Sequence, residues 1–357
     1  MKNLTLFWPE LANYHLTKDV GIIPFVLRKY YDYNSCILVN NEGLVYDDAK
    51  KYLEDLPIKY INNNNDVLIK ILKETDVLMV IGIYNFNLDM INRYKSIRPD
   101  GKIYLKTDMN IHWLNRINLS DYIVDILKKC DLISTECENI CNIMNNAWPV
   151  KIECIPNGYY NFSNLDGSKV LFNEKENIIL TVGRIGTFQK ATEILLDGFR
   201  LCESEIPNWK LKIVGTIEEN FKSYIDNFLK SNPHLDSRVE FTGPIKDKNE
   251  LQNIYRKCKI FCLPSRCEGF PIVFPEAAHN GCYIISTCID PSYDITDHEK
   301  YGRIFPLNNP NYLSQAFIEV CNNEAELERV CNEIQIYANE NFDWIKLCGK
   351  IDSLLNS

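Results

Sequence analysis

The sequence predicts an α/β fold made of two successive doubly wound units, each with a parallel sheet covered by helices. Two observations lead to this prediction. Short apolar runs alternate with segments of helical periodicity, and the alternation stops at a polar stretch and then starts again. The chain has 357 residues, a length expected of about two domains.

The first domain is predicted over residues 1–160. Its apolar runs are typical of buried parallel strands, and they cover residues 4–8, 36–39, 77–84, 102–107, 132–135 and 150–156. Between them, residues 66–75 and 119–130 have apolar side chains at helical spacing, such as Ile123, Ile126 and Leu127.

A polar stretch rich in Asn, Gly and Ser, residues 161–176, is predicted to be an interdomain linker. The alternation then resumes and defines a second domain over residues 177–335. Its expected strands are residues 177–183, 209–215, 239–243, 259–265 and 282–287, and its expected helices are 191–204, 249–257 and 275–280. The remaining stretch, 336–357, is predicted to be helical, with a break near residues 341–343.

Composition excludes several classes of function. The net charge is −9, whereas general binding to nucleic acids needs an excess of Lys and Arg. No apolar run reaches the ~20 residues of a membrane-spanning helix, and the N-terminus is typical of a first strand rather than of a signal peptide. We therefore expect a cytoplasmic protein; peripheral contact with the inner face of the membrane and homo-oligomerisation are both left open.

The sequence predicts no metal site. Its 14 cysteines contain no C-x-x-C motif, and no His lies near them at zinc-finger spacing.

The strongest constellation for chemistry is PSRCEGFPIVFPEAAHNG, residues 264–281. Glu268 lies in a loop after an expected strand, and Glu276 lies near the start of the next helix. Backbone N–H groups at a helix start favour an anion, and carboxylates accept hydrogen bonds from sugar hydroxyls. Two carboxylates on either side of an anion site are suited to binding a sugar diphosphate. The alternative interpretation is that Glu276 is only a favourable charge at a helix N-terminus and that Glu268 is an ordinary acidic residue of a surface loop.

The second constellation is TVGRIGTFQKATEILLDGF, residues 181–199. Arg184 and Lys190 occupy one loop between a strand and a helix. Two cations at one strand end can clamp a diphosphate and offset charge on a leaving group. The alternative is solvated surface charge. Neither G-x-G-x-x-G nor G-x-x-x-x-G-K-[ST] occurs, so a dinucleotide oxidoreductase and a P-loop NTPase are not supported.

These motifs resemble glycosyltransferase family 4, whose members are retaining enzymes of the GT-B fold. The resemblance consists of VGR with Lys190 six residues after Arg184, F-x-G at residues 241–243, LPS-x-x-EGFP-x-x-x-PEA and G-x-x-I-I-S. It is dense over residues 177–307 and weaker in the first domain, where IPNG (155–158) and DLIST (131–135) match. It implies two Rossmann-like domains facing a central cleft, with the last helix crossing back to the N-terminal domain.

The resemblance also implies a role for each matched position. Arg184 and Lys190 would hold the donor diphosphate, Glu268 would contact the donor sugar, and Glu276 would bind the ribose. The other donor-side positions would surround the phosphates, sugar and base: Gly183, Gly215, Pro244, Ile245, Pro264, Ser265, Gly269, Phe270, Pro271, Ile272 and Val273. No metal or other cofactor would be needed. Attack would occur on the front face, with a covalent route through Glu268 as the alternative.

The first domain departs from the family pattern. Its first turn contains only Gly21 in place of a glycine-rich loop, and Thr107 stands near the position where a His is often found. Asp108 is a candidate catalytic residue, or else a cap or turn residue. For the acceptor we consider Gly21, His112 and Trp8, with a structural role as the alternative for His112. Trp8, Tyr14 and Trp113 could stack on a sugar, and core packing is the alternative for each of the three.

The resemblance therefore implies a hexosyltransferase-type retaining enzyme. It would move a sugar from a UDP- or GDP-sugar to a glycan or lipid-linked acceptor, in the assembly of a surface polysaccharide. Two alternatives are left open. One is a non-catalytic, nucleotide-sugar-binding subunit of a glycosyltransferase complex, and the other is a nucleotide-sugar 2-epimerase of the GT-B fold.

Overall fold

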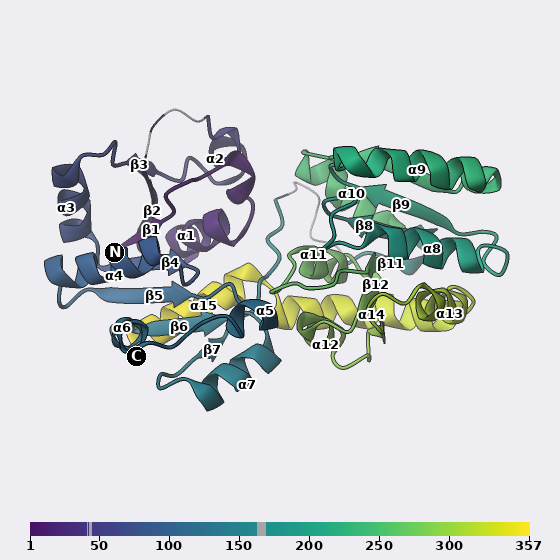
Figure 1. Cartoon of the computed structure of the whole chain (residues 1–357). Coiled ribbons are helices and arrows are strands. Elements are labelled where there is room, and N and C mark those ends of the chain that lie inside the picture. Colours follow the sequence, from purple (N-terminus) through teal and green to yellow (C-terminus); the bar gives the residue numbers. More distant parts are fainter. Residues whose placement is uncertain (41, 43–44, 163–168) are drawn as a thin grey trace. The chain divides into compact units, whose positions relative to one another are not determined.

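The computed structural model describes residues 1–40, 42, 45–162 and 169–357, and they form two compact units (Figure 1). The first unit comprises Met1–Tyr160 together with Asn341–Ser357, and the second comprises Asn161–Glu340. Each unit is built around its own parallel sheet.

The sheet of the first unit has seven parallel strands in the order β3-β2-β1-β4-β5-β6-β7. The strands are β1 (Lys2–Phe7), β2 (Tyr33–Val39), β3 (Ile58–Tyr60), β4 (Val77–Ile81), β5 (Lys102–Lys106), β6 (Leu132–Thr135) and β7 (Glu153–Cys154). All five residues of β4 are buried. A continuous apolar run is what a strand covered by helices on both faces requires.

Eight α-helices belong to the described part of the first unit: α1 (Asp19–Tyr30), α2 (Asp47–Tyr52), α3 (Asn65–Glu74), α4 (Asn85–Ile97), α5 (Ile111–Leu114), α6 (Asp121–Leu127), α7 (Glu138–Ala147) and α15 (Trp344–Asn356). One core lies between the sheet and helices α3, α4, α6 and α7, with side chains such as Leu72, Ile91 and Ile140 fully buried in it. Helix α15 packs against α1, and the Tyr31 hydroxyl donates to the carbonyl of Ile345 at 2.6 Å. The end of the chain is thus part of the first unit.

The second unit repeats the architecture with six parallel strands in the order β10-β9-β8-β11-β12-β13. They are β8 (Glu176–Val182), β9 (Lys210–Val214), β10 (Val239–Gly243), β11 (Cys258–Leu263), β12 (Tyr283–Thr287) and β13 (Gly302–Phe305). The helices are α8 (Thr192–Cys202), α9 (Glu219–Ser231), α10 (Lys248–Lys257), α11 (Val273–His279), α12 (Asp290–Thr296), α13 (Pro310–Cys321) and α14 (Glu324–Asn341). Helices α8 and α13 pack together on the sheet (Figure 1). The order is that of a doubly wound fold, which the sequence predicted for this half.

The predicted linker differs from the structure. Of residues 161–176, residues 163–168 lie outside the described part of the chain, but the end of the stretch is packed into the second unit. Lys175 is buried, and its ammonium donates to the carbonyls of Cys258 and Asn280, both at 2.7 Å. The polar composition of this stretch predicted an exposed linker. Lys175 is instead buried beside β8, where its ammonium group provides hydrogen bonds to buried backbone carbonyls.

Gly21 also differs from its prediction, because it does not lie in an open turn. It is buried in the first turn of α1, and a Cβ at this position would lie 2.0 Å from the carbonyl oxygen of Leu16. The glycine permits a close approach between the helix and the preceding chain, so it is explained by packing. None of the helices in the described ranges is both long and apolar enough to cross a membrane.

Candidate functional site

The strand order of the second unit brings two distant loops together. Strands β8 and β11 are neighbours at the centre of the sheet, where the strand order reverses direction. In open α/β sheets this switch point, at the carboxyl ends of the strands, is where ligands bind. The loop after β8 holds Arg184 and Lys190, and the loop after β11 holds Glu268. The two predicted constellations therefore meet.

Lys190 and Glu268 form the centre of this meeting point. The ammonium Nζ of Lys190 lies 2.6 Å from Oε1 of Glu268, and the two side chains are only 16% and 9% exposed. Oε2 of Glu268 accepts a hydrogen bond from Gln189 at 3.1 Å, and Gln189 also donates to the carbonyl of Cys267 at 2.9 Å. The carboxylate is thus fixed by two donors from the opposite loop. Arg184 is exposed and joins the cluster through Gln189, whose Oε1 accepts from the guanidinium at 3.2 Å.

Arg266 connects the same two loops, although nothing in the sequence pattern singled it out. Its backbone N–H donates to the carbonyl of Gln189 at 2.8 Å, and its guanidinium lies 2.5 Å from Glu193 and 2.6 Å from Asn308. The guanidinium also lies over the ring of Phe188, 4.3 Å from the ring centroid, although that ring is 80% exposed. An Arg with three separate partners can hold two loops in register.

Glycines make the close approach of β8 and β9 possible beyond their ends. Gly215 has φ of +145°, and a Cβ there would lie 1.7 Å from the carbonyl oxygen of Gly183. Gly183 in turn packs under the aliphatic part of Lys190, so the backbone at the site depends on both residues.

Gly215→Ala should therefore destabilise the second unit strongly, by at least about 3 kcal/mol, because a clash adds to an unfavourable backbone conformation. Gly243→Ala is a matched control. Gly243 also has positive φ, +73°, but no atom lies within 4 Å of the added Cβ. It should cost only about 1 kcal/mol. Urea unfolding monitored by circular dichroism measures both, and equal costs would contradict the proposed role of the contact with Gly183.

Glu276 has a different environment from Glu268. It lies within α11 and accepts a hydrogen bond from the hydroxyl of Tyr255 at 2.9 Å. Burial, and then the neighbouring carboxylate, raise the pKa of Tyr255 well above its usual value, so its hydroxyl stays protonated and donates to Glu276. Tyr255 was not predicted as a site residue, because it lies on α10, far from the motif in sequence.

The remaining donor-side positions lie at the same edge of the sheet. Pro264 and Ser265 follow β11 directly and are buried; the hydroxyl of Ser265 has no hydrogen-bond partner among the described residues. Pro264, Gly183, Arg184 and Lys190 line one small cavity of about 10 Å³. Gly269, Phe270, Pro271 and Ile272 lead into α11, which begins at Val273, two residues before the predicted start. Pro244 is exposed and Ile245 half-buried in the loop after β10.

The first unit contains a buried charge cluster at the carboxyl end of its sheet. Lys106, the last residue of β5, is fully buried, with its ammonium 2.6 Å from Glu136 and 3.0 Å from Asp19. Burial by itself would lower the pKa of Lys106, but Asp19, Glu136 and Asp108 outweigh burial and hold that pKa well above its usual value. Glu136 also accepts the backbone N–H groups of Asp108 and Met109, both at 3.1 Å.

Asp108 is held in the left-handed conformation, with φ of +47°. It does not cap a helix: the N-cap of α5 is Asn110, which accepts from the backbone N–H of Trp113 at 3.0 Å. The residue is exposed, yet the surrounding protein reduces the hydration of its carboxyl group, which raises the pKa of Asp108 to about 6. The positive charge of Lys106 lowers this pKa, and the negative charge of Glu136 raises it further.

The predicted acceptor residues differ in their environments. His112 is exposed on α5. Trp8 is half-buried and packs edge-on against His15, with ring centroids 5.2 Å apart, which is the packing role left open above. Gly21 is buried in α1. Of the three residues, only His112 is both exposed and close in sequence to Asp108.

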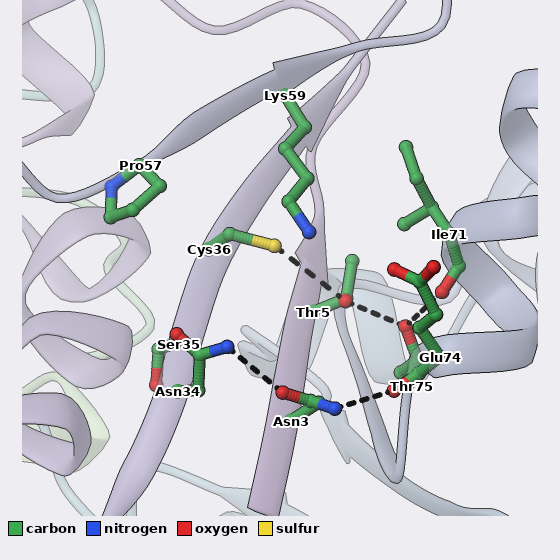
Figure 2. A pocket seen from close by; sticks show the side chains of 10 residues that line it. All are labelled: Asn3, Thr5, Asn34, Ser35, Cys36, Pro57, Lys59, Ile71, Glu74 and Thr75. Atoms are coloured by element: carbon green, nitrogen blue, oxygen red, sulfur yellow. Dashed lines mark hydrogen bonds between the residues drawn. The ribbon is translucent and has the colours of Figure 1, made fainter.

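A further small cavity in the first unit lies near the amino ends of β1 and β2, where ligands of such sheets do not usually bind (Figure 2). Several of its polar groups are hydrogen-bonded to one another, although the buried hydroxyl of Ser35 has no partner among the described residues. Thr5 bonds to Thr75 at 2.7 Å, and Asn3 accepts from Asn34 at 2.9 Å and donates to the carbonyl of Glu74 at 2.8 Å. This cavity is therefore not a candidate site.

Comparison with known proteins identifies the half of the chain that holds the Lys190–Glu268 pair. Residues 164–336 match the family model of glycosyl transferases group 1. The second unit is a glycosyltransferase domain. The match confirms the resemblance of this chain to glycosyltransferases of family 4 type.

Curated relatives of the glycosyltransferase domain include an uncharacterised glycosyltransferase of Methanocaldococcus jannaschii, 30% identical over 50% of this chain and 48% of that protein. The match thus spans about half the length of that relative. The capsular polysaccharide biosynthesis glycosyltransferase CapH of Staphylococcus aureus is 24% identical over 71% of this chain and 69% of CapH. Among solved structures, Anabaena HepE in complex with UDP superposes with a TM-score of 0.76 at 16% identity, over 100% of both chains. The fold is therefore GT-B, with two Rossmann-like domains.

Proposed function

We propose that this chain is a retaining hexosyltransferase. It would move a sugar from a UDP- or GDP-sugar to a glycan or lipid-linked acceptor, in the assembly of a surface polysaccharide at the inner face of the membrane. The donor class is supported by HepE, a structure of which is described as a complex with UDP and glucose. The pathway is supported by CapH, whose name assigns it to capsular polysaccharide.

The observation that carries the proposal is the pair formed by Lys190 and Glu268 at the switch point of the second unit, 2.6 Å apart. An ammonium binds phosphate oxygens as a point charge, and a carboxylate accepts hydrogen bonds from sugar hydroxyls. Their direct contact means that groups able to bind the two halves of a sugar diphosphate lie side by side. Arg184, exposed on the same loop, can add a second cation.

In the proposed mechanism, the leaving diphosphate gains negative charge as the bond to the sugar breaks. Lys190 and Arg184 would stabilise that charge more in the transition state than in the ground state, which lowers the barrier. Glu268 would orient the sugar through its hydroxyls, on a carboxylate already fixed by Gln189. Glu276 would hold the ribose from the start of α11. The acceptor would bind to the first unit and attack on the front face.

The test is incubation of the purified chain with labelled UDP- and GDP-sugars, with and without a glycolipid extract as acceptor. We expect transfer of label to the extract and slow release of nucleoside diphosphate without it. Conversion of the sugar itself without an acceptor would identify an epimerase. Binding of a nucleotide sugar without any turnover would instead identify a non-catalytic subunit.

Metal removal should leave transfer unchanged, because the proposed site supplies positive charge through Lys190 and Arg184. The measurement is the initial rate of transfer before and after dialysis against EDTA, with the rate at added Mg²⁺ or Mn²⁺ as control. A loss of activity that either cation restores would overturn the metal-independent mechanism while leaving the donor class intact.

A further inference from the structure

A cavity of about 290 Å³ lies in the first unit, beside the carboxyl ends of β4 and β5. It is formed by the loop after β4, by the loop after β5 and by the segment that includes α5. The residues that matter for its chemistry are Tyr84, Thr107, Asp108, Trp113 and Arg116. Its volume is close to the lower end of the range of small-molecule sites, about 300 Å³.

Two aromatic side chains line this cavity while remaining open to solvent. Trp113 is 50% exposed and Tyr84 is 42% exposed. The Tyr84 ring is stacked on Phe86, with centroids 5.4 Å apart, and it lies so close to the backbone of Gly82 that a Cβ there would approach it to 2.2 Å. Aromatic faces of this kind bind the C–H faces of sugars. The glycine and the stacked ring fix one such face in place.

Polar groups lie in the same cavity. The hydroxyl of Thr107 is buried and has no hydrogen-bond partner within the described ranges, although buried hydroxyls nearly always have one. Asp108 follows it in a backbone conformation fixed by Glu136, which is itself held by Lys106. A hydroxyl and a carboxylate held in this way can bind neighbouring hydroxyls of a ligand.

Arg116 adds a positive charge. It is exposed, its guanidinium lies 5.7 Å from the centroid of the Trp113 ring, and it forms no ion pair with any residue whose position the structure gives. By contrast, Lys106, Lys190 and Arg266 each lie within 3.0 Å of a carboxylate. A guanidinium next to an aromatic ring, with its donors unused, is suited to a carboxylate or a phosphate group of a ligand bound beside that ring.

We infer that this cavity binds one pyranose ring of the acceptor, and that this ring carries a negatively charged group. Trp113 stacks on the ring, Thr107 and Asp108 bind its hydroxyls, and Arg116 binds the charged group. The inference rests on the proposed function, in which the first unit binds the acceptor. It goes further by naming the class of acceptor sugar and the residues that select it.

The experiment is saturation-transfer NMR on the full chain, with dissociation constants from titration of three probes. They are methyl β-D-glucopyranoside, methyl β-D-glucuronide and D-glucose 6-phosphate, which separate a neutral sugar from a carboxylate and from a phosphate. We expect both anionic probes to bind at least about fivefold more tightly than the neutral one. Whichever anionic probe binds more tightly identifies the charged group.

Two variants locate the binding. Trp113→Ala should abolish binding of all three probes, whereas Arg116→Gln should remove only the preference for the anionic ones. Tyr312→Ala, which removes a 54% exposed aromatic side chain from the second unit, is the control and should change nothing. The inference is overturned if no probe binds, if the neutral probe binds as well as the others, or if Trp113→Ala binds normally.

Titration of the same samples with UDP and GDP separates this inference from the proposed function. If a nucleotide binds and the sugars do not, the acceptor inference fails alone. If the sugars bind as expected and neither nucleotide does, the proposed function fails, and the cavity stands only as a sugar-binding site.

Discussion

Replacing Lys190 or Glu268 with alanine should lower the rate of sugar transfer by at least about tenfold, while the protein remains folded. Lys190→Ala removes a cation that would stabilise the leaving diphosphate, and it leaves the nearly buried carboxylate of Glu268 with Gln189 as its remaining donor in the opposite loop. Glu268→Ala removes the group that would orient the sugar. Steady-state kinetics with a labelled nucleotide sugar measures both effects.

A matched control comes from another ion pair of the same unit. Lys212 and Glu240 lie 2.9 Å apart on β9 and β10, away from the loops after β8 and β11. Lys212→Ala should leave the rate of transfer unchanged, because a half-exposed pair contributes little even to stability. Unchanged rates in both Lys190→Ala and Glu268→Ala would remove the site assignment.

Replacing Lys106 with methionine should lower the free energy of unfolding by about 3–5 kcal/mol, because it leaves two carboxylates in a buried site without their cation. Lys106 is 0% exposed and lies within 3.0 Å of both Asp19 and Glu136. Lys59→Met, at an exposed lysine on β3, should change stability by no more than about 0.5 kcal/mol. Urea unfolding at neutral pH measures both.

A double variant gives a second readout. Without the cation, the carboxylates of Asp19 and Glu136 repel each other in a buried site, and removing one of the two charges relieves that repulsion. Adding Glu136→Gln should recover part of the loss at neutral pH. A loss below about 1 kcal/mol would contradict the account of this cluster.

Much of the fold could be predicted because its strands are buried on both faces. Runs such as residues 77–84 and 259–265 consist mostly of apolar residues, which is what parallel strands under two helical layers require. Strands β3 and β13 were not predicted. Both lie at a sheet edge and have only three or four residues, several of them half-buried or exposed, so no apolar run marks them.

The site was predictable as a set of residues but not as a geometry. Glycine-bearing loops at expected strand ends pointed to Lys190 and Glu268. Their ion pair could not be predicted, because 78 residues separate them and the contact depends on the pairing of β8 with β11. Arg266 and Gln189 were missed for the same reason. Gly21 was predicted to lie in a turn, because glycine is rare inside a helix. Its place in α1 is explained only by the close approach of Leu16, which no sequence pattern shows.

The central claim is that the loops after β8 and β11 bind the diphosphate of a nucleotide sugar. Calorimetric titration of wild type and Lys190→Ala with UDP, GDP, UMP and GMP tests it most directly. We expect one of the two diphosphates to bind at least about tenfold more tightly than its monophosphate, and this advantage to be lost in Lys190→Ala. Absence of binding by both diphosphates, or an equal preference in wild type and variant, would contradict the claim.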